Sequence, residues 1–126
     1  MSYIYLASPY SDPSKTIQHA RYLWACEAAA FMVRKGMKVY SPIVSWHKVA
    51  ERFSLPSDAE FWSKQNASFM LHSTEMWVLT LSGWGQSKGV QSEIAFCKEQ
   101  GIKIYYTEFS DMQKLIDIRQ PILFGV

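Results

Sequence analysis

Residues 76–101 read MWVLTLSGWGQSKGVQSEIAFCKEQG and contain one complete strand–loop–helix unit. Residues 76–81 are a continuous apolar run with the length of a buried strand. Residues 82–89 are rich in glycine, which favours a loop, and residues 90–100 are typical of a helix that stops at Gly101. An apolar strand that is followed, after a loop, by a helix is the repeating unit of a parallel sheet.

The same alternation extends in both directions along the chain. Further strands are predicted at residues 3–7, 37–40 and 102–106, and a long helix at 13–35, with Asp12 as its cap and Gly36 at its end. Residues 43–56 are predicted to be a loop with a helical piece, and the next helix starts at Ser57 or Asp58. After the last strand we expect a helix at 109–116 and a tail at 121–124 that forms an edge strand or a packing arm. The expected fold is α/β, a three-layer doubly wound sheet of flavodoxin or Rossmann type with four to five mainly parallel strands.

Composition excludes several classes of protein. The 126 residues suit one domain, 1–126, and the apolar fraction of 48% excludes a disordered chain. Thirteen basic and eleven acidic residues give a net charge of +2 without a polybasic segment, so we expect no nucleic-acid polymer as a partner. The longest apolar run, residues 28–33, is too short to span a membrane. Cys26 and Cys97 lie far apart, and the first residues lack a signal-peptide pattern, so a reducing cytoplasmic location is expected.

Ligands of such folds bind at the carboxyl ends of the strands, which points to the loops at residues 8–14, 41–47 and 82–89. The third loop is neither a dinucleotide fingerprint nor a P-loop, because its glycine spacing differs and Lys88 precedes the last glycine. It still places Ser87 and free backbone amides before a helix, an arrangement that favours an anion such as phosphate, with Glu93 on the first turns of that helix. The alternative is that Ser87 caps the helix and Glu93 complements its dipole.

Other residues have two interpretations each. Glu75 beside a buried strand needs either a charged partner or a site, and His47 is either a hydrogen-bonded loop residue or a catalytic one. Tyr10 either packs or contacts a ligand. Three tryptophans are predicted to lie in the core: Trp24, Trp62 and Trp77. The other two, Trp46 and Trp84, are on predicted loops, where they either stack on a base or pack against the protein.

Three motifs in order resemble the nucleoside 2-deoxyribosyltransferase superfamily, in particular its small bacterial and phage members. They are YLASPY at 5–10, SPI at 41–43 with His47, and the stretch from Gly83 to Glu93. The resemblance covers residues 3–106 and leaves 110–126 as a divergent tail. It implies that Glu93 is the nucleophile at C1′ of a sugar. Ser87 stands where the transferases have aspartate, which is similar to the 2′-deoxynucleoside 5′-phosphate N-hydrolases, so Ser87 and Gly89 are implied to hold a 5′-phosphate.

Two departures concern acidic positions of the family. Glu75 stands where aspartate is usual, and Asn66 where many relatives have aspartate. The resemblance implies that Glu75 and Glu93 are paired carboxylates, which retention at one anomeric carbon would place roughly 5 Å apart. Ser8, Pro9 and Tyr10 would line the sugar and base pocket, and His47 or Glu75 would protonate the departing base. No metal or cofactor is expected.

The expected function is an N-glycosidase that releases the base from a (deoxy)nucleoside 5′-monophosphate. Two alternatives stay open: a transferase that moves deoxyribose between bases, and a nucleotide-binding sensor that has lost the chemistry. The family also implies a homodimer or higher oligomer. Phe61, Trp62 and residues 122–124 either contact the second copy or cover the core of their own chain.

Overall fold

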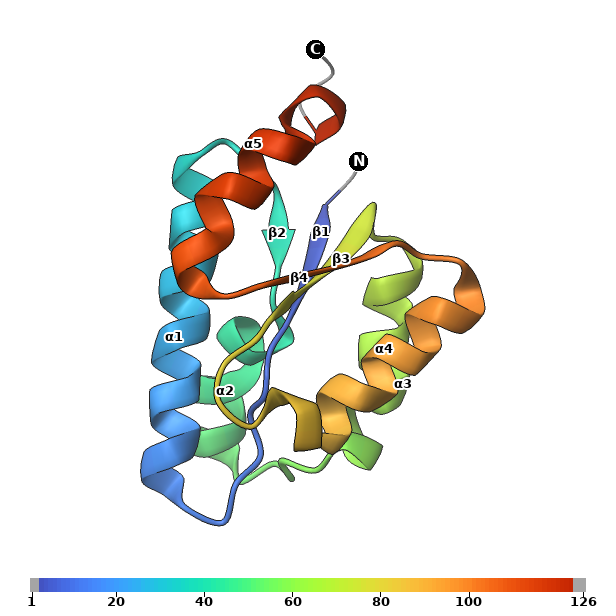
Figure 1. Ribbon diagram of the computed structural model, residues 1–126. Coiled ribbons are helices and arrows are strands. Elements are labelled where there is room, and N and C mark those ends of the chain that lie inside the picture. Colours follow the sequence, from blue (N-terminus) through green and yellow to red (C-terminus); the bar gives the residue numbers. More distant parts are fainter. Residues whose placement is uncertain (1–2, 124–126) are drawn as a thin grey trace.

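The computed structural model of the chain describes residues 3–123 and confirms the α/β fold (Figure 1). Four strands alternate with five helices, and two 3-10 turns, η1 and η2, precede α4 and α5. In chain order the elements are β1 (Ile4–Ala7), α1 (Lys15–Arg34), β2 (Val39–Tyr40), α2 (Pro42–Phe53), α3 (Ala59–Leu71), β3 (Glu75–Leu79), η1 (Trp84–Gln86), α4 (Lys88–Gln100), β4 (Ile104–Thr107), η2 (Phe109–Asp111) and α5 (Met112–Leu123).

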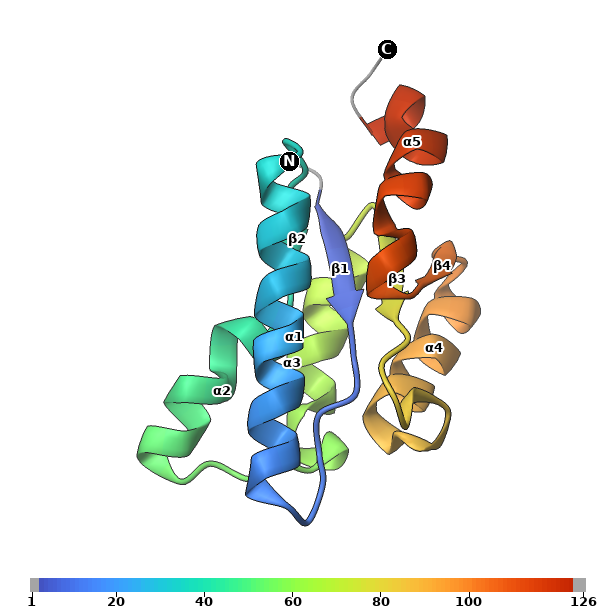
Figure 2. The same ribbon diagram turned by 60° about the vertical axis from the view of Figure 1, so that its left-hand side comes forward.

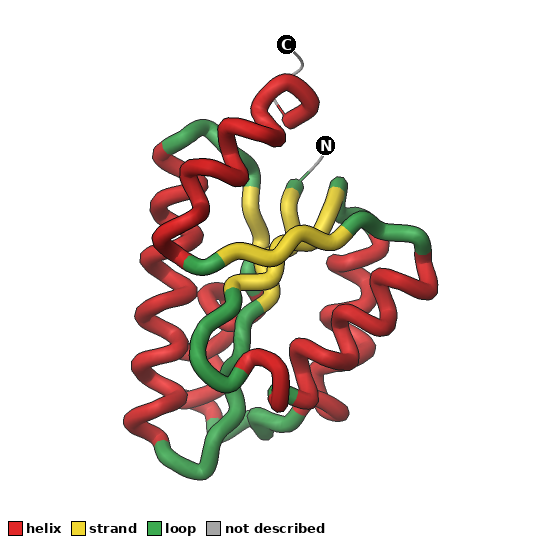
Figure 3. The backbone as a smooth tube through the Cα atoms, in the orientation of Figure 1, coloured by secondary structure: helices red, strands yellow, loops and turns green. Residues whose placement is uncertain are grey.

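All strand pairs are parallel, in the order β2-β1-β3-β4 (Figure 3). The chain moves from β1 outward to β2 and then returns across β1 to form β3. The strand order therefore reverses between β1 and β3, and the crevice outside the carboxyl ends of these two strands is where ligands of such sheets bind.

Residues that alternate along the strands face two different helical layers. Ile4, Leu6, Trp77 and Leu79 form a core with α1 and α5, whereas Tyr5, Ala7, Met76 and Val78 form a core with α3 and α4. Figure 2 shows the sheet between these layers. This three-layer arrangement is the one expected from the sequence. Among residues 3–123, no helix is both long and apolar enough to cross a membrane.

Helix α2 corrects the prediction that residues 43–56 are a loop with a helical piece, because residues 42–53 form one continuous helix. Ser41 is its cap, because its side chain accepts a hydrogen bond from the Val44 amide at 3.2 Å, and Pro42 occupies the first helical turn. Ile43, His47 and Ala50 are buried along one side of α2, at helical spacing. In α1 the cap is Ser14 rather than the predicted Asp12.

The C-terminal segment also differs from the prediction. Helix α5 continues to Leu123, so residues 121–123 are helical rather than an edge strand, while position 124 lies outside the described residues. Met112 and Ile116 of α5 are buried in the core beside α1. Trp24, predicted to lie in the core, is 45% exposed on α1 and contacts Phe109 edge-on.

Glu75 faces the layer of α1 and α5 and has a charged partner there, which corrects the predicted pairing of this residue with Glu93. Glu75 opens β3 and shares a face with Trp77, whose Nε1 donates to Oε2 at 2.7 Å. Arg119 of α5 pairs with both of its carboxylate oxygens, through Nη2 to Oε1 and Nε to Oε2. Glu93 lies on α4, which covers the opposite face. Because the sheet separates the two carboxylates, the expected pair at about 5 Å does not form.

Arg119→Ala should lower the free energy of unfolding by about 3–5 kcal/mol, because it leaves the buried Glu75 carboxylate without its partner. Urea denaturation measures the loss. Gln113→Ala, which removes an exposed bond to Asp117 on the same helix, is the control and should cost less than about 0.5 kcal/mol. Equal stability of Arg119→Ala and the control would contradict this role for Glu75.

Candidate active site

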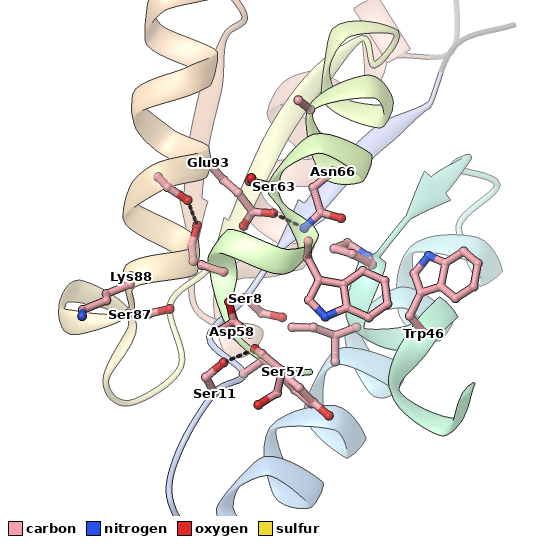
Figure 4. Close-up of a pocket in the computed structure, with 18 of the residues that line it drawn as sticks. Ser8, Ser11, Trp46, Ser57, Asp58, Ser63, Asn66, Ser87, Lys88 and Glu93 are labelled. Carbon is pink, nitrogen blue, oxygen red and sulfur yellow. Dashed lines mark hydrogen bonds between the residues drawn. The ribbon is translucent and has the colours of Figure 1, made fainter. Parts of the chain in front are cut away.

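A cavity of about 450 Å³ lies at the carboxyl ends of the central strands, bounded by α2, α3 and α4 (Figure 4). This volume lies within the range of small-molecule sites. Ser8 and Tyr10 reach it from the loop after β1, and Ser87, Lys88 and Glu93 from the segment after β3. Each contributing element begins or ends at this edge of the sheet, so the parallel topology brings together residues that are distant in the sequence.

Glu93 forms the centre of this site. Its carboxylate accepts a hydrogen bond from the hydroxyl of Tyr5, a fully buried residue of β1, and a longer one, 3.4 Å, from Nδ2 of Asn66 on α3. Three elements therefore orient one acid, and Figure 4 shows the side chain of Asn66 pointing toward that of Glu93. Burial raises the pKa of Glu93 from 4.5 to about 7, against the opposing effect of the bonds from Tyr5 and Asn66.

One side of the cavity is formed by the beginning of α4. Ser87 is the N-cap, with its Oγ accepting from the Val90 amide at 3.2 Å. The amides of Lys88 and Gly89 are in the first turn, where no carbonyl of the helix can accept from them. Together with the exposed Lys88 ammonium they favour an anionic group here. A Cβ at Gly89 would make only ordinary contacts, at 3.9 Å, so space does not require glycine at this position.

The opposite side is aromatic and apolar. Trp46 of α2 and Trp62 of α3 lie with ring centroids 5.9 Å apart, and Figure 4 shows Trp46 across the cavity from Ser87 and Lys88. The remaining apolar lining residues are Pro42, Ile43, Ala50, Ala59, Ala67, Met70 and Phe96. Trp62 was predicted to lie in the core, but it is only half-buried. The cavity thus has an end suited to an anion and an end suited to a flat apolar group.

His47 is held firmly in the wall. The Tyr10 hydroxyl and its Nδ1 are 2.7 Å apart, and its ring stacks on Tyr22 with centroids 4.2 Å apart. Burial lowers the pKa of His47. The negative charge of Glu51, whose Oε2 is 3.8 Å from Nε2, opposes this shift but is the smaller effect. The imidazole is therefore neutral at pH 7.

Three buried side-chain atoms among residues 3–123 have no hydrogen-bond partner, and all three belong to residues that line this cavity. They are Ser8 Oγ, His47 Nε2 and Asn66 Oδ1. Buried polar atoms are usually satisfied, because leaving one without a partner costs about 1–3 kcal/mol. Their concentration at one cavity leaves three polar atoms available to water or to a ligand.

The cavity is lined by most of the site residues that were predicted from the sequence. Ser8, Tyr10, His47, Ser87, Gly89 and Glu93 line the cavity, whereas Glu75 does not, and Pro9 is fully buried outside the lining. Tyr5 was missed as a site residue because it is inside a strand, where its hydroxyl gave no signal in the sequence. In residues 3–123 no cluster of three or more acidic, histidine or cysteine side chains is arranged to hold a metal ion.

Glu93 should make the stability of the fold depend on pH. The pKa of Glu93 rises on folding, so the protonated acid is favoured in the folded state. Its contribution to the free energy of unfolding is therefore fully present below pH 4.5 and is lost as the pH rises through about 7. Relative to Glu93→Gln, which does not titrate, the wild type should lose about 3 kcal/mol between about pH 4 and pH 8. Urea denaturation across this range measures the difference. Glu99→Gln, exposed on the same helix, is the control, and a pH-independent difference for Glu93→Gln would contradict the account.

Comparison with known proteins places the chain in a family. No curated protein matches the sequence. A family model described as a domain of unknown function, DUF1937, matches residues 2–109, a span that includes every residue of the cavity. The chain therefore belongs to the DUF1937 family.

Proposed function

We propose that the protein is an N-glycosidase that cleaves the base–sugar bond of (deoxy)nucleoside 5′-monophosphates, with Glu93 as the nucleophile. The observation that carries the proposal is the position of Glu93, a buried carboxyl between an anion-favouring helix start and an aromatic wall. A nucleotide has the matching order of groups, with phosphate at one end, base at the other and C1′ of the sugar between them.

The chemistry requires one carboxylate at C1′. Glu93 attacks C1′ as the C1′–N bond breaks, and the base leaves with the electron pair and takes up a proton. Water then adds to C1′, loses a proton and frees the Glu93 carboxylate. Tyr5 and Asn66 support this role because their hydrogen bonds stabilise the ionised acid. Of the two proton donors considered from the sequence, Glu75 and His47, only His47 lines the cavity. Because burial lowers the pKa of His47, only its imidazolium fraction, which grows as the pH falls, can protonate the base.

The remaining expectations also belong to the proposal. A cytoplasmic location is supported by the two free cysteines, Cys26 and Cys97. A homo-oligomer is supported by Phe61, which is 48% exposed beside Trp62 near the cavity. Asn66 carries a neutral amide and Glu75 lies outside the cavity, so the carboxylates that line it are Glu93 and the exposed Asp58. This lining would also suit a protein that binds a nucleotide without cleaving it.

Incubation of the purified protein with a panel of ribo- and deoxyribonucleoside 5′-monophosphates should release free base, detected by chromatography. Glu93→Gln should reduce release by at least about a thousandfold, because removing a nucleophile costs several kcal/mol in the transition state. Glu99→Gln is the control and should retain activity.

The outcomes separate the alternatives. Base release that requires an added acceptor base would indicate the transferase. Tight binding of an unaltered nucleotide, in both wild type and Glu93→Gln, would indicate a sensor. Either result, or no release from any member of the panel, would overturn the hydrolase.

Ser87→Ala should raise KM for a 5′-monophosphate about tenfold and leave KM for the matching nucleoside unchanged, because only the phosphate contacts the start of α4. Ser14→Ala removes the equivalent cap of α1, away from the cavity, and controls for the loss of a helix cap. Parallel kinetics on the two substrates measure the effect, and equal KM changes for both would contradict a phosphate at Ser87.

A further inference from the structure

We infer that Arg21 is a positioning residue that ties the loop after β3 to the loop after β1, and so sets the width of the cavity at its anion-favouring end. The inference rests on the proposed function where it concerns the ligand. Arg21 lies on α1 and is not part of the cavity lining. It therefore acts on the site through the two loops that it joins.

The guanidinium of Arg21 spans the two loops. Its Nη1 donates to the Ser11 carbonyl at 2.9 Å and to the Tyr10 carbonyl at 3.4 Å, and its Nη2 donates to the Ser82 carbonyl at 3.3 Å. Among residues 3–123 it makes no ion pair with a carboxylate. A planar fork of donors serves two separate chain segments at once, which the single ammonium of lysine does not reproduce.

Gly83 shows that the loop after β3 is shaped around this guanidinium. Its φ is +88°, and a Cβ built there would lie 2.7 Å from Nη2 of Arg21. The positive φ favours glycine at 83, and any larger residue there would also displace the guanidinium of Arg21 from its present position. Gly85, two residues later, has open space around an added Cβ and no positive φ.

Both loops continue directly into the cavity wall. On one side Tyr10 and Ser11 line it, and on the other Gln86 and Ser87. Between Gly83 and Ser87 the chain is a compact turn, with the Gln86 amide bonded to the Gly83 carbonyl at 3.2 Å and the Ser87 amide to the Trp84 carbonyl at 3.3 Å. A shift of Gly83 is thus transmitted to Ser87 and the start of α4.

The test compares Arg21→Ala, Arg21→Lys and Gly85→Ala with the wild type in two measurements. The first is hydrogen exchange of the backbone amides of residues 82–87 without ligand, which should speed up in Arg21→Ala and stay at the wild-type rate in Gly85→Ala. The second is kinetics with a 5′-monophosphate. Arg21→Ala should raise KM about tenfold, with kcat changed less than about twofold, because it loosens binding without touching Glu93.

Arg21→Lys should fall between Arg21→Ala and the wild type in both measurements, because it keeps the charge and loses the fork. Thermal denaturation of each variant identifies loss of folding, and if Arg21→Ala is not folded, Arg21→Lys decides the question. Unchanged exchange at residues 82–87 in both Arg21 variants, or equal losses in KM and kcat, would overturn the inference. If the wild type neither binds nor cleaves any nucleotide, the proposed function fails, and the exchange measurement still decides whether Arg21 joins the loops.

Discussion

The arrangement of the site depends on one constraint, the burial of the Glu93 carboxyl at the edge of a parallel sheet. The hydroxyl of Tyr5 comes from the central strand β1, the amide of Asn66 from α3, and the acid itself from α4. These two donors do not fully replace water, since burial still raises the pKa of Glu93 to about 7. The fold therefore keeps a costly group in place, and perturbed acids of this kind cluster at functional sites.

In residues 3–123 two glutamates are buried, and they lie on opposite sides of the sheet. Glu75 faces the layer of α1 and α5, where Arg119 and Trp77 satisfy its oxygens. Glu93 faces the other layer and the cavity, where its partners are neutral hydrogen-bond donors. Glu75 therefore has a guanidinium as its partner, whereas Glu93 has no cationic partner among residues 3–123, and burial raises the pKa of Glu93 to about 7.

The sequence predicted the features that arise from local pattern. The apolar strands, the glycine-terminated helix α4 and the position of Ser87 and Glu93 follow from residue types at short spacing, and the structure has them. Helix α2 was predicted only as a helical piece within residues 43–56, because the Ser41 cap and Pro42 in the first turn were not recognised as a helix start. The partners of Glu75 and Glu93 were not predictable, because Arg119 and Tyr5 lie 44 and 88 residues away and meet them only through the folded topology.

The central claim is that Glu93 forms a bond to the sugar, and mass spectrometry of the acid-quenched reaction tests it most directly. A 2′-deoxynucleoside 5′-monophosphate is mixed with the wild type, quenched rapidly, and the digested protein is searched for a deoxyribose-phosphate adduct. The account predicts this adduct on the peptide that contains Glu93, assigned to that residue by fragmentation. Release of base with the Glu93 peptide unmodified and an adduct on another residue would contradict it.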